Sequence, residues 1–320
     1  MGADRPPAEL VEAAIHASAR LPLTLVLAAR RRDLPPHLPP TIEVLDCPPE
    51  EGEGSSIVRG IAVVGRGEAD AFLSPGSTGA VVRTAILRLG RLPGVLRPGL
   101  CASLPTLHGE MLLIDAGATA DPKPAHIAQF AQLGLAYAHG VLGISRPTAG
   151  LLNIGTEQGK GDRLTRAAYD LLAVRDDFVG NIEPHTVLTE RPADVVVCGG
   201  FTGNLFLKAL EGGVAAILAA AGNALRRSPR TRLGGWLAQP ALRAVGRGFR
   251  YEEHNAAPLL GVRGLVLVAH GRSDGRAIGG ALRRAFLASQ SGIVETLHSL
   301  FAPAGRANPD DRRVRSATTS

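Results

Sequence analysis

Short apolar runs alternate along this chain with stretches of helical periodicity, and this alternation restricts the fold more than any other feature. It is typical of βαβ units, in which helices connect the strands of a mostly parallel sheet. The predicted strands cover residues 24–29, 41–47, 69–74, 111–117, 149–155, 193–200 and 264–271. The predicted helices cover residues 8–20, 78–90, 124–140, 162–174, 203–222 and 275–298.

Composition places this α/β chain among globular proteins. Its 320 residues are 45% hydrophobic, which is enough to build a substantial core. The net charge of +6 comes with only 4% aromatic residues, so an acidic protein or an anionic lipid surface is a better expected partner than nucleic acid. The three cysteines are far apart and indicate neither disulfides nor a zinc site, which favours the cytoplasm. We predict neither a signal peptide nor a membrane-spanning helix.

Glycine-rich segments connect the predicted strands to the helices that follow. They read "LSPGSTGA", "DAGATADPKP", "NIGTEQGKGD", "CGGFTGN" and "AHGRSDG". In a parallel sheet such segments emerge at one carboxyl edge, where open α/β folds bind ligands. Glycine permits close approach of the backbone, and the N-terminus of the following helix favours an anion. We therefore expect all of them to form one anion pocket.

The segment "NIGTEQGKGDRLT", residues 153–165, looks like a phosphate loop but matches neither standard nucleotide pattern. Three residues separate Gly155 from Gly159, and Gly161 follows Lys160 where a P-loop has Ser or Thr. We interpret it as one wall of the shared anion pocket. A turn that leaves Lys160 in solvent is the alternative.

Long segments of this chain resemble the PlsX family of bacterial phosphate acyltransferases. These are "ADAFLSPGSTGAVVRTAILRLGRLPGVLRPGLCASLPT", "DAGATADPKPAHIAQFAQLGLAYAHGVLGISRPTAGLLNIGTEQGKGDRLTRAAYDLL", "ADVVVCGGFTGNLFLKALEG" and "YEEHNAAPLLGVRGLVLVAHGRSDGRAI". The resemblance implies a doubly wound, three-layer α/β/α fold of the isocitrate dehydrogenase type and a homodimer. It also implies fatty acyl transfer from acyl carrier protein to inorganic phosphate, for phospholipid synthesis, with no metal or organic cofactor.

Phosphate is already a nucleophile, so this reaction needs positioning and charge neutralisation more than a protein nucleophile. Lys123 and Lys160 are the candidates for neutralising phosphate, and His270 could assist the thioester oxygen or the departing thiolate. The alternative for His270 is a structural role, as a histidine at the end of a strand that hydrogen-bonds the backbone. Cys198 is expected to be a buried strand residue. The candidate substrate-binding residues are Ser74, Gly76, Ser77, Thr78, Gly79, Asn153, Gly155, Thr202 and Asn204.

The chain departs from the family pattern at several points. It has "SPGSTGA" for "SAGNTGA", so that Ser77 replaces an amide, and "CGGF" for "CDGF", so that a carboxylate is absent at Gly199. It has "HNAAPLLG" for "YGGAPLLG", and we expect Ala256 to adopt a left-handed backbone at a cost. It starts at "MGADRPP", where relatives have a strand leading into "DAMGGD". We expect the native product to begin upstream.

One stretch does not fit the alternation of predicted strands and helices. Residues 224–250 place Leu233, Trp236 and Leu237 at helical spacing among many arginines, which predicts a basic amphipathic helical arm. Its apolar stripe could contact either an anionic membrane surface or a dimer partner. The resemblance favours peripheral membrane association. We assign residues 1–302 to a single domain that includes this arm, and residues 303–320 to a disordered tail.

Three other functions remain open. The first is a phosphate acetyl- or butyryltransferase that uses acyl-CoA. The second is a non-catalytic paralogue that binds acyl carrier protein or membrane, which the departures at Ser77, Gly199 and Ala256 favour. The third is a metal-dependent hydroxyacid dehydrogenase, for which the sequence offers no pair of aspartates at one-turn spacing on a candidate helix.

Overall fold

The computed structural model describes residues 7–47, 55–248, 256–269 and 275–302. The helices are α1 (Pro7–Ser18), α2 (Ser56–Gly65), α3 (Thr78–Arg88), α4 (Pro124–Gly140), α5 (Arg163–Leu172), α6 (Pro184–Thr189), α7 (Gly200–Arg226), α8 (Pro229–Gly248), α9 (Gly275–Gln290) and α10 (Ile293–Phe301). The strands are β1 (Leu25–Ala29), β2 (Ile42–Asp46), β3 (Ala71–Ser74), β4 (Gly99–Thr106), β5 (Gly109–Ile114), β6 (Ala149–Leu152), β7 (Phe178–Ile182), β8 (Val195–Val197), β9 (Ala256–Leu260) and β10 (Leu265–Ala269).

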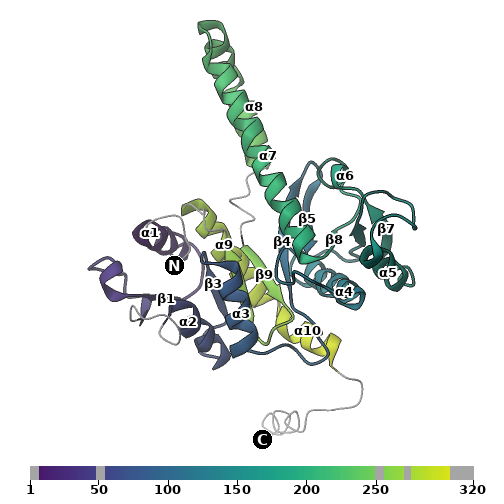
Figure 1. The fold of residues 1–320 in the computed structure, drawn as a ribbon. Coiled ribbons are helices and arrows are strands. Elements are labelled where there is room, and N and C mark those ends of the chain that lie inside the picture. The colour runs from purple at the N-terminus through teal and green to yellow at the C-terminus, as the bar shows by residue number, and fades with distance from the viewer. Residues whose placement is uncertain (1–6, 48–54, 249–255, 270–274, 303–320) are drawn as a thin grey trace, which may run out of the picture.

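An eight-stranded sheet forms the centre of the molecule, in the order β3-β10-β9-β4-β5-β8-β6-β7 (Figure 1). Strands β5, β8, β6 and β7 are mutually parallel. The strands β4, β9 and β10 each run antiparallel to the next along the sheet, and β3 is parallel to β10. Therefore β3 and β10 run opposite to β5. A separate pair, β1 and β2, is parallel.

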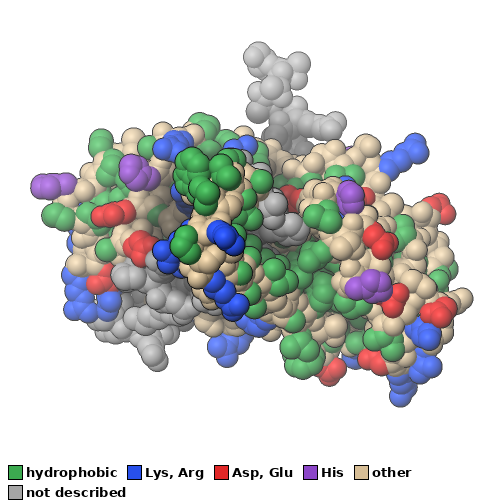
Figure 2. Space-filling view, turned by 90° about the horizontal axis from the view of Figure 1, so that it is seen from above, with side chains coloured by type: hydrophobic (Ala, Val, Ile, Leu, Met, Phe, Trp, Pro, Cys, Tyr) green, Lys and Arg blue, Asp and Glu red, His purple; other side chains and the backbone are tan. Residues whose placement is uncertain are grey.

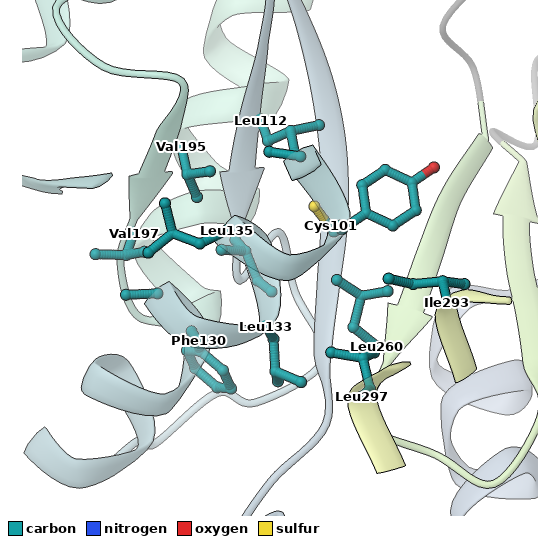
Figure 3. Close-up of a cluster of buried hydrophobic side chains, with 14 of the residues drawn as sticks. Cys101, Leu112, Phe130, Leu133, Leu135, Val195, Val197, Leu260, Ile293 and Leu297 are labelled. Atoms are coloured by element: carbon teal, nitrogen blue, oxygen red, sulfur yellow. The ribbon is translucent and has the colours of Figure 1, made fainter. Parts of the chain in front are cut away.

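Helices cover both faces of this sheet, which confirms the predicted three-layer α/β/α fold. One apolar cluster joins alternate strand residues, such as Leu112 and Val195, to α4, α5, α9 and α10 (Figure 3). The other joins the residues between them, such as Leu113 and Val196, to α2, α3, α6 and the start of α7. Burial on both faces explains why β5 and β8 are apolar without interruption.

The predicted strands and helices all have counterparts, but strands β4, β7 and β9 were missed. Each contains a residue that disfavours strands: Pro105 in β4, Gly180 with a φ of 98° in β7, and Pro258 in β9. The predicted helix over 275–298 is two helices, because Gly292 adopts a left-handed φ of 61° between them.

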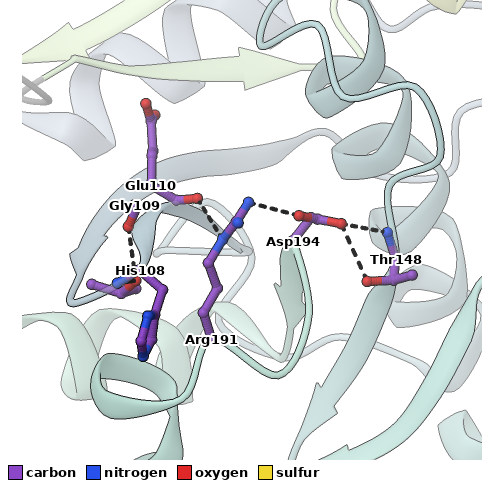
Figure 4. A network of polar contacts seen from close by, with 7 residues as sticks. His108, Gly109, Glu110, Thr148, Arg191 and Asp194 are labelled. Carbon is purple, nitrogen blue, oxygen red and sulfur yellow. Dashed lines mark hydrogen bonds and ion pairs between the residues drawn. The ribbon is translucent and has the colours of Figure 1, made fainter.

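A polar network closes the edge of the sheet where β5 and β8 begin (Figure 4). Asp194 accepts hydrogen bonds from the backbone N–H of Thr148 at 2.9 Å and from the Arg191 guanidinium at 2.7 Å. Arg191 also donates to the carbonyl of Glu110 at 3.2 Å. These contacts tie three loops together at this edge of the sheet.

The predicted arm is a pair of helices that projects from the body (Figure 1). It is longer than predicted, because α7 leaves the core after Leu210 and continues to Arg226 before α8 begins. Leu233, Trp236 and Leu237 are each at least 60% exposed, and Figure 2 shows hydrophobic and basic side chains gathered on the arm. Residues 249 and 250 of the predicted arm lie outside the described residues, as do residues 303–320.

The expectation that no segment could span a membrane needs correction. Among the described residues, α7 is long and apolar enough to cross one, by length and composition alone. None of its most apolar window is buried in the protein, so this is not a core helix. Exposed apolar surface of this kind, on α7 and α8, is typical of sites that contact another protein or a membrane.

Candidate active site

The strand directions divide the glycine-rich segments into two groups, so the prediction of one shared edge is wrong. The segments after β5, β6 and β8 lie at one edge, which we call the β5 edge. The segment after β3 lies at the opposite edge, because β3 is antiparallel to β5. Sequence alone could not show this, because the reversal is made by β4 and β9, which were not predicted.

The position of Lys123 supports this division. Its side chain lines the same cavity as Ile86 and Arg91, at the C-terminal end of α3. The residues Ser77, Thr78 and Gly79 lie at the other end of that helix, which at about 1.5 Å per residue is roughly 16 Å long. Ser74 is buried and accepts a hydrogen bond from the N–H of Gly76 at 3.1 Å. Strand β10 ends at Ala269, and His270 lies outside the described residues.

At the β5 edge, Asp115 organises the loop over residues 115–123. Its fully buried carboxylate accepts backbone hydrogen bonds from Leu100 at 3.0 Å, Gly117 at 3.0 Å, Ala118 at 2.8 Å and Thr119 at 2.7 Å. Burial raises the pKa of Asp115, and these four N–H groups act in the opposite direction. Sequence reasoning missed this role, although an aspartate that ends a buried strand before small residues was the available signal.

The start of α7 packs directly on the Asp115 loop. A Cβ at Gly203 would lie 2.0 Å from the carbonyl oxygen of Asp115, and one at Gly200 would lie 2.5 Å from its carboxylate. Both glycines are therefore required by close approach of two backbones. Asn204 contacts Gly117 of the same loop, since a Cβ at Gly117 would lie 3.3 Å from that of Asn204. The packing leaves Thr202 and Asn204 exposed beside the loop.

The segments that follow β5, β6 and β8 meet at Gly199. A Cβ there would lie 2.9 Å from Cγ of Pro122 and 4.0 Å from Cδ2 of Leu164, at the start of α5. We call residues 115–123, 153–164 and 199–204 the three-loop cluster. The cluster contains six of the predicted site residues: Lys123, Asn153, Gly155, Lys160, Thr202 and Asn204.

Two buried amides hold the loop that carries Lys160. Asn153, at the end of β6, donates to the carbonyl oxygen of Lys160 at 3.1 Å and to the side chain of Asn181 at 3.0 Å. Asn181, on β7, donates to the carbonyl oxygen of Glu157 at 2.8 Å. The amide of Asn153 fixes the loop, and the predicted contact of Asn153 with substrate stays a prediction. The role of Asn181 was missed because β7 was not predicted.

Lys160 reaches solvent from this fixed loop. Its stem lies over Gly155, where a Cβ would be 2.9 Å from its Cγ, and its side chain is 50% exposed. The ammonium lies 3.9 Å from the carboxylate of Glu157, which is a long and solvent-exposed ion pair of small energy. The charge of Lys160 is therefore accessible to an anion. Cys198, at the end of β8, is buried as predicted, and burial raises the pKa of its thiol, which makes it a poor nucleophile.

The structure also bears on the departures from the family pattern. Ala256 is the buried first residue of β9, and the only non-glycine with a positive φ among the described residues is Arg191, so the expected left-handed backbone at Ala256 is wrong. At Gly199 the missing side chain is what lets Pro122 approach. Ser77 precedes α3 without a side-chain capping bond. No group of three or more metal-ligating side chains occurs in the described part of the chain.

Comparison with known proteins gives concordant matches. The family model described as "Fatty acid synthesis protein" matches residues 41–296. A phosphate acyltransferase from Desulfitobacterium hafniense is 38% identical over 315 residues, covering 93% of this chain and 94% of that protein. One from Dehalococcoides mccartyi is 40% identical over 315 residues, covering 91% and 90%.

Solved structures with a similar fold are more distant in sequence. A branched-chain phosphotransacylase from Enterococcus faecalis is 14% identical, with a TM-score of 0.58 and coverage of 90% of this chain and 96% of that protein. A phosphotransacetylase from Staphylococcus aureus is also 14% identical, with a TM-score of 0.56 and coverage of 89% and 92%. At this identity the likeness establishes the fold alone.

Proposed function

Because this chain belongs to the phosphate acyltransferase family, we propose that it transfers a fatty acyl group from acyl carrier protein to inorganic phosphate. The product, an acyl phosphate, supplies phospholipid synthesis. The observation that carries this proposal is the extended similarity to phosphate acyltransferases, together with a family match over residues 41–296 that spans all segments of the three-loop cluster.

In the proposed reaction a phosphate oxygen attacks the thioester carbonyl carbon. The new carbon–oxygen bond forms as the carbon–sulfur bond breaks, and the thiolate leaves and takes up a proton. We assign Lys160 to charge on the phosphate, since its ammonium is accessible at the three-loop cluster. The predicted role of Lys123 in neutralising the same phosphate stays a prediction, and Lys123 lines a cavity with Arg97 and His126. Thr202 and Asn204 are exposed at the start of α7, where side-chain and backbone donors favour an anion. Roles in substrate binding for Ser74, Gly76, Ser77, Thr78 and Gly79, and a catalytic role for His270, stay predictions.

The identity of the acyl donor distinguishes this proposed reaction from the alternative functions. We expect purified protein to consume acyl carrier protein thioester only when phosphate is present, and to use acyl-CoA poorly. A preference for short acyl-CoA donors would assign the chain to the acetyl- or butyryltransferase class. Binding of the carrier without turnover would support the non-catalytic paralogue.

We propose further that the protein is a cytoplasmic homodimer that associates peripherally with anionic membranes. The helical arm supports the membrane part of this proposal. It presents Trp236 beside Leu233 and Leu237, with Arg230 and Arg232 nearby, which is the combination that binds the interface of an anionic bilayer. Packing of the same stripe against the second protomer is the competing arrangement.

Replacing both Trp236 and Leu237 with serine tests the membrane role. We expect affinity for vesicles that contain phosphatidylglycerol to fall at least about 100-fold, because burial of each large apolar side chain contributes roughly 1.5 to 3 kcal/mol. Vesicle co-sedimentation measures the affinity, and sedimentation velocity measures the oligomeric state. The matched control replaces Leu171 and Val174, which are exposed on the body, and should bind vesicles normally. Dissociation to monomers with unchanged vesicle binding would instead place the stripe in the dimer interface.

A further inference from the structure

A basic cavity of about 460 Å³ lies between the C-terminal end of α3 and the start of α4. Its charged lining consists of Arg91, Arg97, Lys123 and His126, and Ile86 and Leu96 supply apolar surface. No carboxylate lines it. In the described part of the chain, none of its three fixed cations has a salt bridge to an acidic side chain.

Gln129 of α4 fixes the loop that lines one side of this cavity. The side chain of Gln129 donates to the carbonyl of Gly94 at 2.9 Å and accepts from the N–H of Leu96 at 2.7 Å. Arg91 donates to the carbonyl of Val95 at 3.2 Å, and its own carbonyl accepts from Arg263 at 3.1 Å. The segment that carries Arg91 and Arg97 is therefore fixed before any ligand arrives, which lowers the entropic cost of binding.

The pKa of His126 reflects the positive charge in this cavity. Its Nδ1 accepts the backbone N–H of Lys123 at 3.0 Å, so the neutral ring carries its proton on Nε2 and has a donor left. Partial burial lowers the pKa of His126, and Arg97, Lys123 and Arg91 lower it further. Arg91, Arg97 and Lys123 therefore repel one another and the protonated form of His126. Binding of an anion in the cavity offsets this repulsion.

We propose that this cavity binds a phosphate ester, with the phosphate group on Arg97, Lys123 and His126 and the attached arm along Ile86 and Leu96. The volume falls within the range of pockets for small organic molecules and exceeds what inorganic phosphate needs. Phosphopantetheine, the arm that presents acyl groups as thioesters, has this chemistry. Its identification rests on the proposed function, whereas binding of a phosphate ester by the cavity does not.

The experiment is a titration of the protein, with its histidines labelled with carbon-13, by phosphopantetheine, pantetheine and inorganic phosphate in separate arms. The His126→Gln variant identifies the His126 signal among the nine histidines. We expect phosphopantetheine to shift the His126 signal saturably and to raise its pKa, because the bound phosphate offsets the charges of Arg91, Arg97 and Lys123. Both other compounds should bind at least about tenfold more weakly.

The Arg97→Ala variant should bind phosphopantetheine about 10- to 100-fold more weakly, as expected for loss of a charge-assisted hydrogen bond. The control is Arg146→Ala, which removes another exposed arginine from the loop before β6 at the other edge of the sheet, and should bind normally. Equal affinity for pantetheine would overturn the phosphate contact, and equal affinity for inorganic phosphate would overturn the ester. Because the titration needs no turnover, an inactive protein that binds would reject the proposed function but not this cavity.

Discussion

Lys160→Ala is expected to reduce acyl phosphate formation about 100- to 1000-fold, the usual effect of removing one electrostatic contact to developing charge. The loss should appear both as a higher KM for phosphate and as a lower kcat, because the ammonium meets phosphate charge on binding and in the transition state. The two buried amides should keep the loop in place, since they bond the backbone of residues 157 and 160 and not the lysine side chain. Steady-state kinetics with varied phosphate measures the effect.

Lys208→Ala is the matched control for Lys160. Lys208 is also exposed, but it lies two turns into α7, past the residues that meet the Asp115 loop. Its loss should change kcat/KM less than about twofold, within the range of ordinary surface substitutions. If the two variants behave alike in an active enzyme, Lys160 has no role in the reaction and residues 153–161 form only a turn.

Asp115→Ala is expected to destabilise the protein by about 3 to 5 kcal/mol, a large part of the total stability of a typical domain. The substitution removes the acceptor of four backbone N–H groups, and each donor left buried without a partner costs about 1 to 3 kcal/mol. Water that enters the new cavity offsets part of this sum. Urea denaturation measures the free energy of unfolding.

Asp162→Ala provides the comparison, because Asp162 also accepts a backbone hydrogen bond, from Thr165 at 2.7 Å, but does so at the exposed N-cap of α5. The loss should be about 1 kcal/mol, since water can satisfy the freed N–H groups. Equal effects of the two substitutions would show that the Asp115 loop is not held by its buried carboxylate.

The layers of this fold could be predicted from sequence because burial on both sheet faces produces unbroken apolar runs such as "MLLIDAG" and "ADVVVCGG". The strand directions could not be predicted. They depend on β4 and β9, where Pro105 and Pro258 interrupt the apolar pattern although long-range pairing still forms a sheet. Propensity is a local property, and although β4 pairs with the following β5 and β9 with the following β10, the pairing of β4 with β9 joins segments that are distant in the chain.

The same limit applies to the site. Glycine-rich junctions correctly indicated where backbones approach closely, and Gly199, Gly200 and Gly203 all lie at such contacts. Whether a polar side chain faces solvent or supports a loop was not visible in the sequence. Asn153, which was predicted to bind substrate, also bonds the backbone of Lys160 and the side chain of Asn181. This supporting pair could not be predicted, because Asn181 comes from β7, a strand that was missed since it has a glycine at its centre.

The most direct measurement of the proposed reaction uses phosphate in which all four oxygens are oxygen-18, together with acyl carrier protein loaded with a fatty acyl thioester. If phosphate oxygen attacks the thioester carbon, mass spectrometry should find acyl phosphate that retains all four labelled oxygens, formed in equal amount to the free carrier thiol. Release of the thiol with unlabelled fatty acid as the sole product, or no release of thiol, would contradict acyl transfer to phosphate.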